Sequence, residues 1–299
     1  MGREFAGLYP VAQETFDEAD DALGYKLSQV CFDGPEEKLK LTEITQPAIL
    51  TVSVAACRVL QSKAIAPSYV AGHSLGEYSA HVAAGTLSFS DAVRTVRNRG
   101  KYLQEAVPVG VGAMAAILML ATDEVRQICE EAAQGEVSQA ANLNSPEQTV
   151  ISGSKAAVER AVELAKKRGV KRAIMLPVSA PFHCALMQPA QDRLADDLRA
   201  LTFHTPQVPV MCNVEAALVT TAEQAREALV RQVTGAVQWD KSMRALAALG
   251  VQNFIEVGPG KVLCGLMRQV DRSRTCLNVD DEASLQKTVN HFSPASPKD

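Results

Sequence analysis

Apolar residues recur at helical spacing in the N-terminal part of the chain. Phe5, Leu8, Val11, Phe16 and Ala19 predict one helix over residues 3–23. A second helix is predicted over residues 45–64, with Thr45 as its N-cap. Pro47 is tolerated there because its missing N–H would have no partner in a first helical turn. The short apolar run 68–71 then predicts a strand, and it is followed by a glycine-flanked turn and a third helix.

The pattern changes in the middle of the chain. A strand (113–120) and a helix (122–134) are followed by two strands (137–144 and 148–153), a helix (154–169) and a strand (171–178). This βαββαβ order is that of a ferredoxin-like unit. We therefore predict a small subdomain over residues 109–180, inserted into a larger unit made of residues 1–108 and 181–290.

The C-terminal part returns to alternating helices and short strands. Helices are predicted at 184–201, 221–233 and 239–250, and strands at 209–214 and 253–257. This alternation predicts the α/β class, with a large α/β-hydrolase-like subdomain built on a mostly parallel sheet. Residues 291–299 are rich in proline and serine and are expected to form a flexible tail.

Composition narrows the function classes. The 299 residues carry a formal net charge of -4 and no long basic tract, which argues against nucleic acid as a main partner. The seven cysteines show no metal-ligand spacing, so we expect free thiols in a reducing compartment and no metal site. The acidic N-terminus does not resemble a signal peptide, and no apolar run is expected to reach the length of a membrane span. These features predict a cytoplasmic protein without a membrane partner.

The segment GHSLG at residues 72–76 has the pattern G-x-S-x-G between a predicted strand and a predicted helix. Glycines at 72 and 76 allow a tight elbow that exposes the Ser74 hydroxyl and turns the Leu75 N–H toward a reacting carbonyl. A serine nucleophile also needs a nearby base. The pentapeptide by itself is equally compatible with a capped helix start.

Five histidines could supply the base. His73 adjoins the serine, His81 lies two turns along the next helix, and His291 lies in the predicted tail. His183 and His204 remain, and His183 is favoured because it follows a predicted strand, where catalytic groups of α/β proteins often lie. In an α/β-hydrolase the histidine comes near the chain end, so the order of residues does not match that class.

Several further motifs occur in order between about residues 42 and 266. They are TQPAIL, GHSLGEYSA, RGKYLQEAVPVGVGAMAAIL, ANLNSPEQTVISG, APFHCALM and EVGPGKVL. With these motifs the chain resembles the malonyl-CoA:acyl carrier protein transacylases, the acyltransferases of fatty acid and polyketide synthesis.

The resemblance implies a ping-pong reaction through Ser74, which would take a malonyl group from coenzyme A and pass it to the phosphopantetheine thiol of acyl carrier protein. His183 would be the base, oriented by backbone carbonyl oxygen from near Gln232 in place of a carboxylate. Leu75 would donate its N–H to the oxyanion. The thioester is a substrate, so no cofactor is implied, and the family usually works as a monomer.

The resemblance also implies a set of residues that bind the acyl group. Arg99 would hold the malonyl carboxylate in a planar bidentate pair; without the resemblance it would be interpreted as a solvated helix charge. Gln46 would line the acyl pocket, and Phe182 would narrow it. Asn142 would lie near the pantetheine channel, although turn or cap chemistry explains it equally well. Leu103 occupies a position where many members have methionine.

The chain departs from the family pattern at its start. Members begin with a strand and a GQGSQ-type loop ahead of the helix that opens this sequence. Their absence is expected to leave backbone groups of the sheet unpaired and to remove the second oxyanion donor.

Three alternatives stay open at this point. A stand-alone acyltransferase of polyketide synthesis has nearly the same motifs. A serine hydrolase of acyl thioesters would use water as the acceptor, and one that acts on neutral esters would have no use for a buried Arg99. A non-catalytic fragment would only bind carrier protein.

Overall fold

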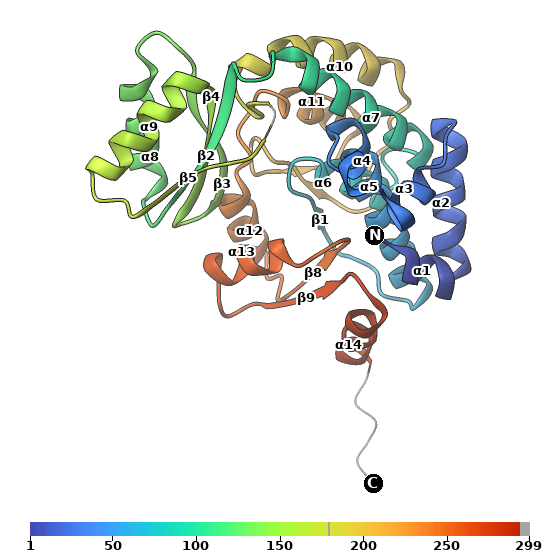
Figure 1. The fold of residues 1–299 in the computed structure, drawn as a ribbon. Helices are drawn as coiled ribbons and strands as arrows, with labels where there is room; N and C mark the ends of the chain where they lie inside the picture. The colour runs from blue at the N-terminus through green and yellow to red at the C-terminus, as the bar shows by residue number, and fades with distance from the viewer. Residues whose placement is uncertain (179, 294–299) are drawn as a thin grey trace.

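The computed structural model describes residues 1–178 and 180–293. Its helices are α1 (Arg3–Leu8), α2 (Pro10–Leu23), α3 (Leu27–Asp33), α4 (Glu36–Leu39), α5 (Thr42–Ser62), α6 (Gly76–Ala83), α7 (Phe89–Ala106), α8 (Thr122–Ala133), α9 (Lys155–Lys167), the 3-10 turn η1 (Ala185–Met187), α10 (Gln188–Ala200), α11 (Ala222–Arg231), α12 (Trp239–Ala248), α13 (Val262–Val270) and α14 (Glu282–Phe292). Its strands are β1 (Val70–Ala71), β2 (Gly112–Leu118), β3 (Ser138–Ser145), β4 (Gln148–Ser154), β5 (Arg172–Met175), β6 (Val210–Met211), β7 (Leu218–Val219), β8 (Asn253–Val257) and β9 (Thr275–Val279). The fold is mixed α/β (Figure 1).

The first predicted helix is divided in two. Tyr9 is extended, with φ -127° and ψ 114°, and α2 begins at Pro10. A residue before proline is pushed away from the helical region, which explains the break. The expectation of one continuous helix over residues 3–23 was therefore wrong.

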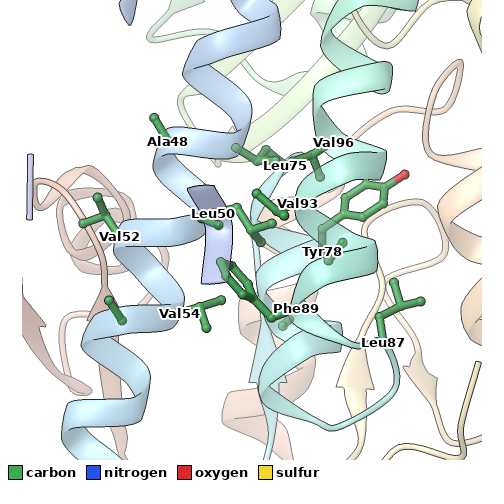
Figure 2. Packing of buried hydrophobic residues seen from close by; sticks show 14 of the residues in the cluster. Ala48, Leu50, Val52, Val54, Leu75, Tyr78, Leu87, Phe89, Val93 and Val96 are labelled. Carbon is green, nitrogen blue, oxygen red and sulfur yellow. The ribbon is translucent and has the colours of Figure 1, made fainter. Parts of the chain in front are cut away.

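Helix α5 is the core helix of the larger part of the molecule. It packs with α6 and α7 around the buried residues that Figure 2 draws, including Leu50, Tyr78 and Val93. The helix starts at Thr42, three residues before the predicted cap, so Pro47 lies inside it. By length and composition α5 could cross a membrane, contrary to the sequence-based expectation, but most of it is buried inside the protein. Its apolar character is accounted for by the core.

Residues 112–175 contain the predicted order of strands and helices. The strands pair in the order β3-β4-β2-β5, and every pair is antiparallel. Helices α8 and α9 pack against each other and against this sheet, and their apolar residues form a separate core cluster with Ile117 and Ile151. In Figure 1 this unit lies to one side of the molecule.

The larger part holds two small sheets where one mostly parallel sheet was predicted. One sheet has the order β1-β6-β7, with a parallel pair β1–β6 and an antiparallel pair β6–β7. The other is the parallel pair β8–β9. Strands β1, β6 and β7 have two residues each, so their ladders are short, and β1 does not pair with β8 within the described residues.

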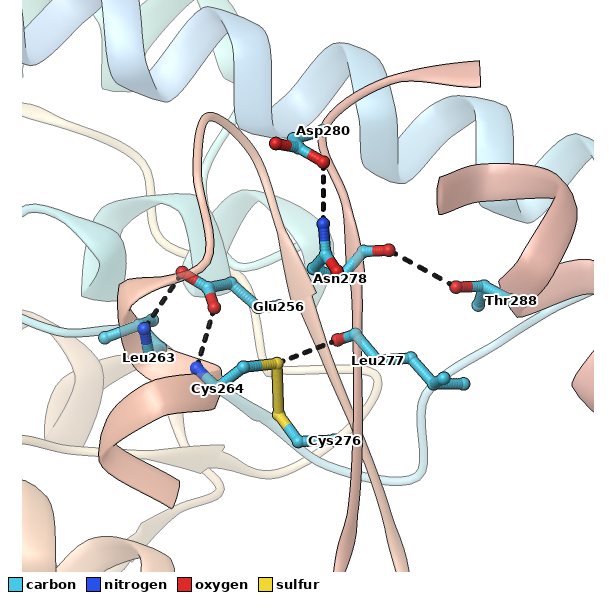
Figure 3. Close-up of a disulfide and its surroundings, with 8 residues drawn as sticks. All are labelled: Glu256, Leu263, Cys264, Cys276, Leu277, Asn278, Asp280 and Thr288. Atoms are coloured by element: carbon cyan, nitrogen blue, oxygen red, sulfur yellow. Dashed lines mark hydrogen bonds between the residues drawn. A yellow bond between two sulfur atoms is a disulfide. The ribbon is translucent and has the colours of Figure 1, made fainter. Parts of the chain in front are cut away.

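Cys264 of α13 and Cys276 of β9 form a disulfide (Figure 3). The prediction of free thiols was therefore wrong for this pair, which lies twelve residues apart in the sequence but side by side in the fold. Helix α14 runs to Phe292, so it includes the first residues of the predicted tail, and His291 contacts Asn253. Residues 294–299 of that tail lie outside the described part.

Candidate active site

Ser74 lies on the turn between β1 and α6. Its φ of 51° is in the left-handed region, which is rare for a residue with a side chain and common at strained functional turns. Gly72 makes the turn possible, because a Cβ there would lie 1.9 Å from backbone atoms of Gly76. A Cβ on Gly76 would meet no atom within 4 Å, so only the first of the two predicted glycines is required by space.

His183 contacts the serine directly. Its Nε2 lies 2.7 Å from the Ser74 Oγ, and its Nδ1 lies 2.9 Å from the Gln232 carbonyl oxygen and 3.2 Å from that of Gly235. The two carbonyl oxygens can only accept, so Nδ1 carries the proton and Nε2 is free to accept one from the serine. Burial and the nearby charge of Arg99 lower the pKa of His183 to about 3, which keeps the imidazole neutral in the resting site. His204, the other candidate, is exposed.

Strand β3, at the edge of its sheet, forms hydrogen bonds with two segments. One carries His183, and the other carries the carbonyl oxygens that accept from its Nδ1. The Leu143 N–H donates to the Val237 carbonyl oxygen at 2.8 Å, and the Val237 N–H donates to that of Ala141 at 2.8 Å. The Gln139 side chain accepts from the Ala185 N–H at 2.8 Å, two residues after the histidine. The antiparallel unit therefore contributes to the geometry of the base.

Arg99, from α7, places a buried cation beside the serine. Its side chain donates to Gln46 Oε1 at 2.9 Å, to Gln232 Oε1 at 3.0 Å and to Ser74 Oγ at 3.3 Å. All of these acceptors are neutral, and the guanidinium also lies over the Tyr78 ring. The residue is only 3% exposed, and burial lowers its pKa, although a guanidinium stays charged in proteins. Within the described residues, this cation has no hydrogen bond to an anion.

The remaining predicted residues occupy different positions. Leu103 is buried one turn along α7 from the arginine, and Phe182 is half-buried, packed against two apolar clusters. Asn142 lies on β3, and its buried Oδ1 has no partner in the described part of the chain. The Leu75 N–H donates to no acceptor among the described residues, so it remains available to a ligand.

Two polar residues at the site were missed by the sequence reasoning. Asn213 follows β6 and bonds the N-terminal side of the elbow: its Oδ1 accepts from the Ser74 N–H and its Nδ2 donates to the Gly72 carbonyl oxygen, each at 2.7 Å. Glu77, in α6, is fully buried, and burial raises its pKa to about 7. A usable signal was the position of Asn213 at the end of a predicted strand. Glu77 belongs to the motif GHSLGEYSA, but its place in the first turn of a helix does not predict that it is buried.

Together these groups can carry out acyl transfer to and from a serine. A hydroxyl with a neutral base supplies the nucleophile, a free N–H one residue on can stabilise an oxyanion, and a buried cation can bind an anionic acyl group.

The chain matches the family model described as acyl transferase domain over residues 1–290. It is 51% identical over 286 residues to the malonyl CoA-acyl carrier protein transacylase of Escherichia coli strain K12, an alignment that covers 95% of this chain and 93% of that one. The chain belongs to the malonyl CoA-acyl carrier protein transacylase family.

Other members of the family agree in sequence and structure. The Bacillus subtilis transacylase is 47% identical over 97% of this chain and 92% of its own. The structure of the transacylase from Coxiella burnetii superposes with a TM-score of 0.96 at 43% identity, covering 98% of this chain and 93% of that one. A malonyl-transacylase solved in complex with a type II polyketide acyl-carrier protein superposes with a TM-score of 0.95 at 46% identity, over 97% and 94% of the two chains.

Proposed function

We propose that this chain transfers the malonyl group of malonyl-CoA to the phosphopantetheine thiol of acyl carrier protein, through an ester on Ser74. The observation that carries the proposal is Arg99: a buried cation, hydrogen-bonded only to neutral oxygens, 3.3 Å from the serine hydroxyl. The buried Glu77 acts on Arg99 through its charge but forms its hydrogen bonds with Asn213 and Gln232. A buried charge is costly without a directly paired counter-charge. A malonyl group carries a carboxylate that can pair with Arg99. Because Arg99 lies beside the serine hydroxyl, this pairing also brings the thioester carbonyl within reach of Ser74.

In the first half-reaction the Ser74 Oγ attacks the thioester carbonyl and His183 Nε2 takes the hydroxyl proton. The oxyanion forms next to the Leu75 N–H. When the intermediate collapses, the carbon–sulfur bond breaks and the leaving sulfur takes the proton from the imidazole. The products are malonyl-Ser74 and coenzyme A, with His183 neutral again.

In the second half-reaction the carrier-protein thiol attacks the ester and gives its proton to His183. When the intermediate collapses, the bond between the acyl carbon and the Ser74 oxygen breaks and that oxygen takes the proton from the imidazole, so the products are malonyl carrier protein and free Ser74. Carbonyl oxygens of Gln232 and Gly235 support the transient imidazolium through Nδ1. In the first half-reaction such neutral acceptors suffice because the leaving group is a thiolate, which leaves more easily than an amine. Gln46 and Gln232 hold the guanidinium fork in place for the malonyl carboxylate.

The remaining predicted roles belong to the same proposal. Phe182 narrows the acyl pocket, Leu103 lines it beside the carboxylate, and Asn142, with its unpaired amide oxygen, faces the pantetheine arm. A wall at Phe182 disfavours one added methyl group by about 1–3 kcal/mol. No metal or redox group is needed by these steps.

We assign residues 1–108 and 181–290 to an α/β-hydrolase-like subdomain and residues 109–180 to a ferredoxin-like one. The strand order β3-β4-β2-β5 and the separate core of this unit support that division. The protein is proposed to act as a monomer in the cytoplasm, in fatty acid biosynthesis. The likeness to a transacylase solved with a polyketide carrier protein keeps polyketide synthesis as the second candidate.

The test is intact-protein mass spectrometry of the chain after incubation with malonyl-CoA, beside Ser74→Ala and Arg99→Ala. We expect a malonyl adduct on the parent, none on Ser74→Ala and little on Arg99→Ala. Addition of holo acyl carrier protein should then clear the adduct and leave malonyl carrier protein. Adduct loss at the same rate without carrier protein would indicate a hydrolase, and a folded sample without adduct would refute acyl transfer by this chain.

A further inference from the structure

Asn213 spans the strained turn that carries the nucleophile. The residue is 1% exposed, and its side chain makes two hydrogen bonds of 2.7 Å, one to the Ser74 N–H and one to the Gly72 carbonyl oxygen. Both bonds lie on the N-terminal side of Ser74, whose φ is 51°, and on its C-terminal side the Ser74 carbonyl oxygen accepts from Gln232 Nε2 at 2.9 Å. A left-handed conformation persists only where its surroundings hold it, and here Asn213 holds the N-terminal side of Ser74 and Gln232 holds the C-terminal side.

The bond from the Ser74 N–H to Asn213 also decides which N–H of the turn is free. Because the Ser74 N–H donates to Asn213, it is not available to an oxyanion, whereas the Leu75 N–H is. A relaxed turn would reorient both N–H groups and would move the Oγ from its position 2.7 Å from His183 Nε2. Asn213 therefore controls the nucleophile and the oxyanion donor together.

Glu77 holds Asn213 in place by accepting a hydrogen bond from its backbone N–H. Its Oε2 accepts from the Asn213 N–H at 3.1 Å and from Gln232 Nε2 at 2.8 Å. The same Nε2 donates to the Ser74 carbonyl oxygen at 2.9 Å, which closes a ring of hydrogen bonds through Ser74, Asn213, Glu77 and Gln232. Gln232 is also the residue that bonds Arg99 and His183. One buried carboxyl group thus connects the nucleophile turn with the segment that orients the base and the cation.

We propose that Asn213, supported by Glu77, is a positioning residue that holds the Ser74 turn in its reactive conformation. Only the assay with malonyl-CoA depends on the proposed function. The effect of Asn213 on the reactivity of Ser74 does not depend on it. Asn213 touches no reacting atom, so it acts on the rate of acylation and not on the capture of the malonyl carboxylate.

The experiment measures single-turnover acylation by malonyl-CoA and, independently, labelling of Ser74 by a fluorophosphonate. Asn213→Ala should slow both rates by about a hundredfold, the scale of a misplaced reacting group, while KM for malonyl-CoA changes less than about threefold. Asn213→Asp keeps the acceptor for the Ser74 N–H and should fall between parent and Asn213→Ala. The control is Asn278→Ala. This variant removes a side-chain amide of β9 that donates to Asp280 at 2.6 Å.

Glu77 provides the second pair of variants. Glu77→Gln keeps an oxygen that can accept from Asn213 and Gln232, so it should retain activity within about threefold, whereas Glu77→Leu should lose at least about tenfold. Rescue by the conservative variant separates positioning from general destabilisation, and thermal melts confirm that each variant is folded.

Two outcomes overturn the inference. One is that the fluorophosphonate labels Asn213→Ala at the parent rate, whatever the melting temperature of the variant. The other is that the acylation and labelling rates fall equally in the Asn278→Ala control. If malonyl-CoA fails to acylate the parent but the fluorophosphonate labels the parent and not Asn213→Ala, the proposed function fails and the positioning role stands.

Discussion

Replacement of Arg99 by alanine tests the central physical argument. The guanidinium is 3% exposed and donates to Gln46, Gln232 and Ser74 in the absence of substrate. A bidentate pair with the malonyl carboxylate would form in a site closed to water, where removal of one partner of a buried charge pair costs about 3–5 kcal/mol. At 1.4 kcal/mol per factor of ten, we expect kcat/KM for malonyl-CoA to fall roughly a hundredfold to a few thousandfold.

Acetyl-CoA is the matched substrate, because it has the same thioester without the carboxylate. Its rate should change less than about tenfold in Arg99→Ala, so that the preference for malonyl-CoA collapses. Arg99→Lys keeps the charge but loses the planar fork and should fall between parent and alanine. Arg94→Ala, on the same helix with a half-exposed side chain paired to Asp91, is the control and should leave both rates unchanged.

The variant must also be shown to fold. Loss of the guanidinium leaves Gln46 Oε1 and Gln232 Oε1 without that donor, at a cost of about 1–3 kcal/mol for each unpaired buried group. A cooperative thermal melt establishes that the protein remains folded. If the rates with malonyl-CoA and acetyl-CoA fall by the same factor, Arg99 acts through Ser74 and Gln232 and the carboxylate argument is refuted.

Further predictions concern pH and the cysteines. Because His183 must be neutral to accept a proton and its pKa is lowered to about 3, Ser74 acylation should stay level from pH 8 down to about pH 5; a rate that falls by half near pH 6.5 would contradict this. Burial raises the pKa of Glu77 from 4.5 to about 7, so its stabilising contribution is complete below about pH 4.5 and is lost as the pH rises through 7. In thermal melts, the free energy of unfolding of Glu77→Gln should therefore rise relative to that of the parent between pH 5 and pH 8, by at most roughly 3 kcal/mol. A difference that stays constant with pH would contradict this prediction. Thiol titration of the unfolded chain should find five thiols without reductant and seven with it, and reduction of the Cys264–Cys276 bond should lower the free energy of unfolding by up to about 3 kcal/mol; seven thiols at the start would contradict the disulfide.

Much of the secondary structure follows from local pattern. The apolar spacing of residues 112–175 predicted each strand and helix of that unit in order, because amphipathic periodicity is set by which face of an element is buried. Local pattern was less reliable where chain geometry intervened. Pro10 divided the first helix, and α5 continued through Pro47 because its burial in the core outweighs one lost hydrogen bond.

The sequence by itself determined the family and the residue types at the site. Ser74 in GHSLG, His183 after a strand and Arg99 in a helix could all be named from motifs in order. Those motifs describe neighbours along the chain, and they say nothing of the contacts between segments far apart in sequence.

The tertiary structure decided those contacts. It placed His183 109 residues from Ser74 in sequence but at 2.7 Å in space, and it buried Arg99 among neutral oxygens. It also brought Asn213 and Glu77 next to the nucleophile turn, where the Asn213 amide bonds the Ser74 N–H and the Gly72 carbonyl oxygen on the N-terminal side of the strained residue. Burial and strain are properties of the packed fold, because the groups that remove water or constrain a turn come from other elements. The contacts through which such a residue acts are therefore not specified by its own stretch of sequence.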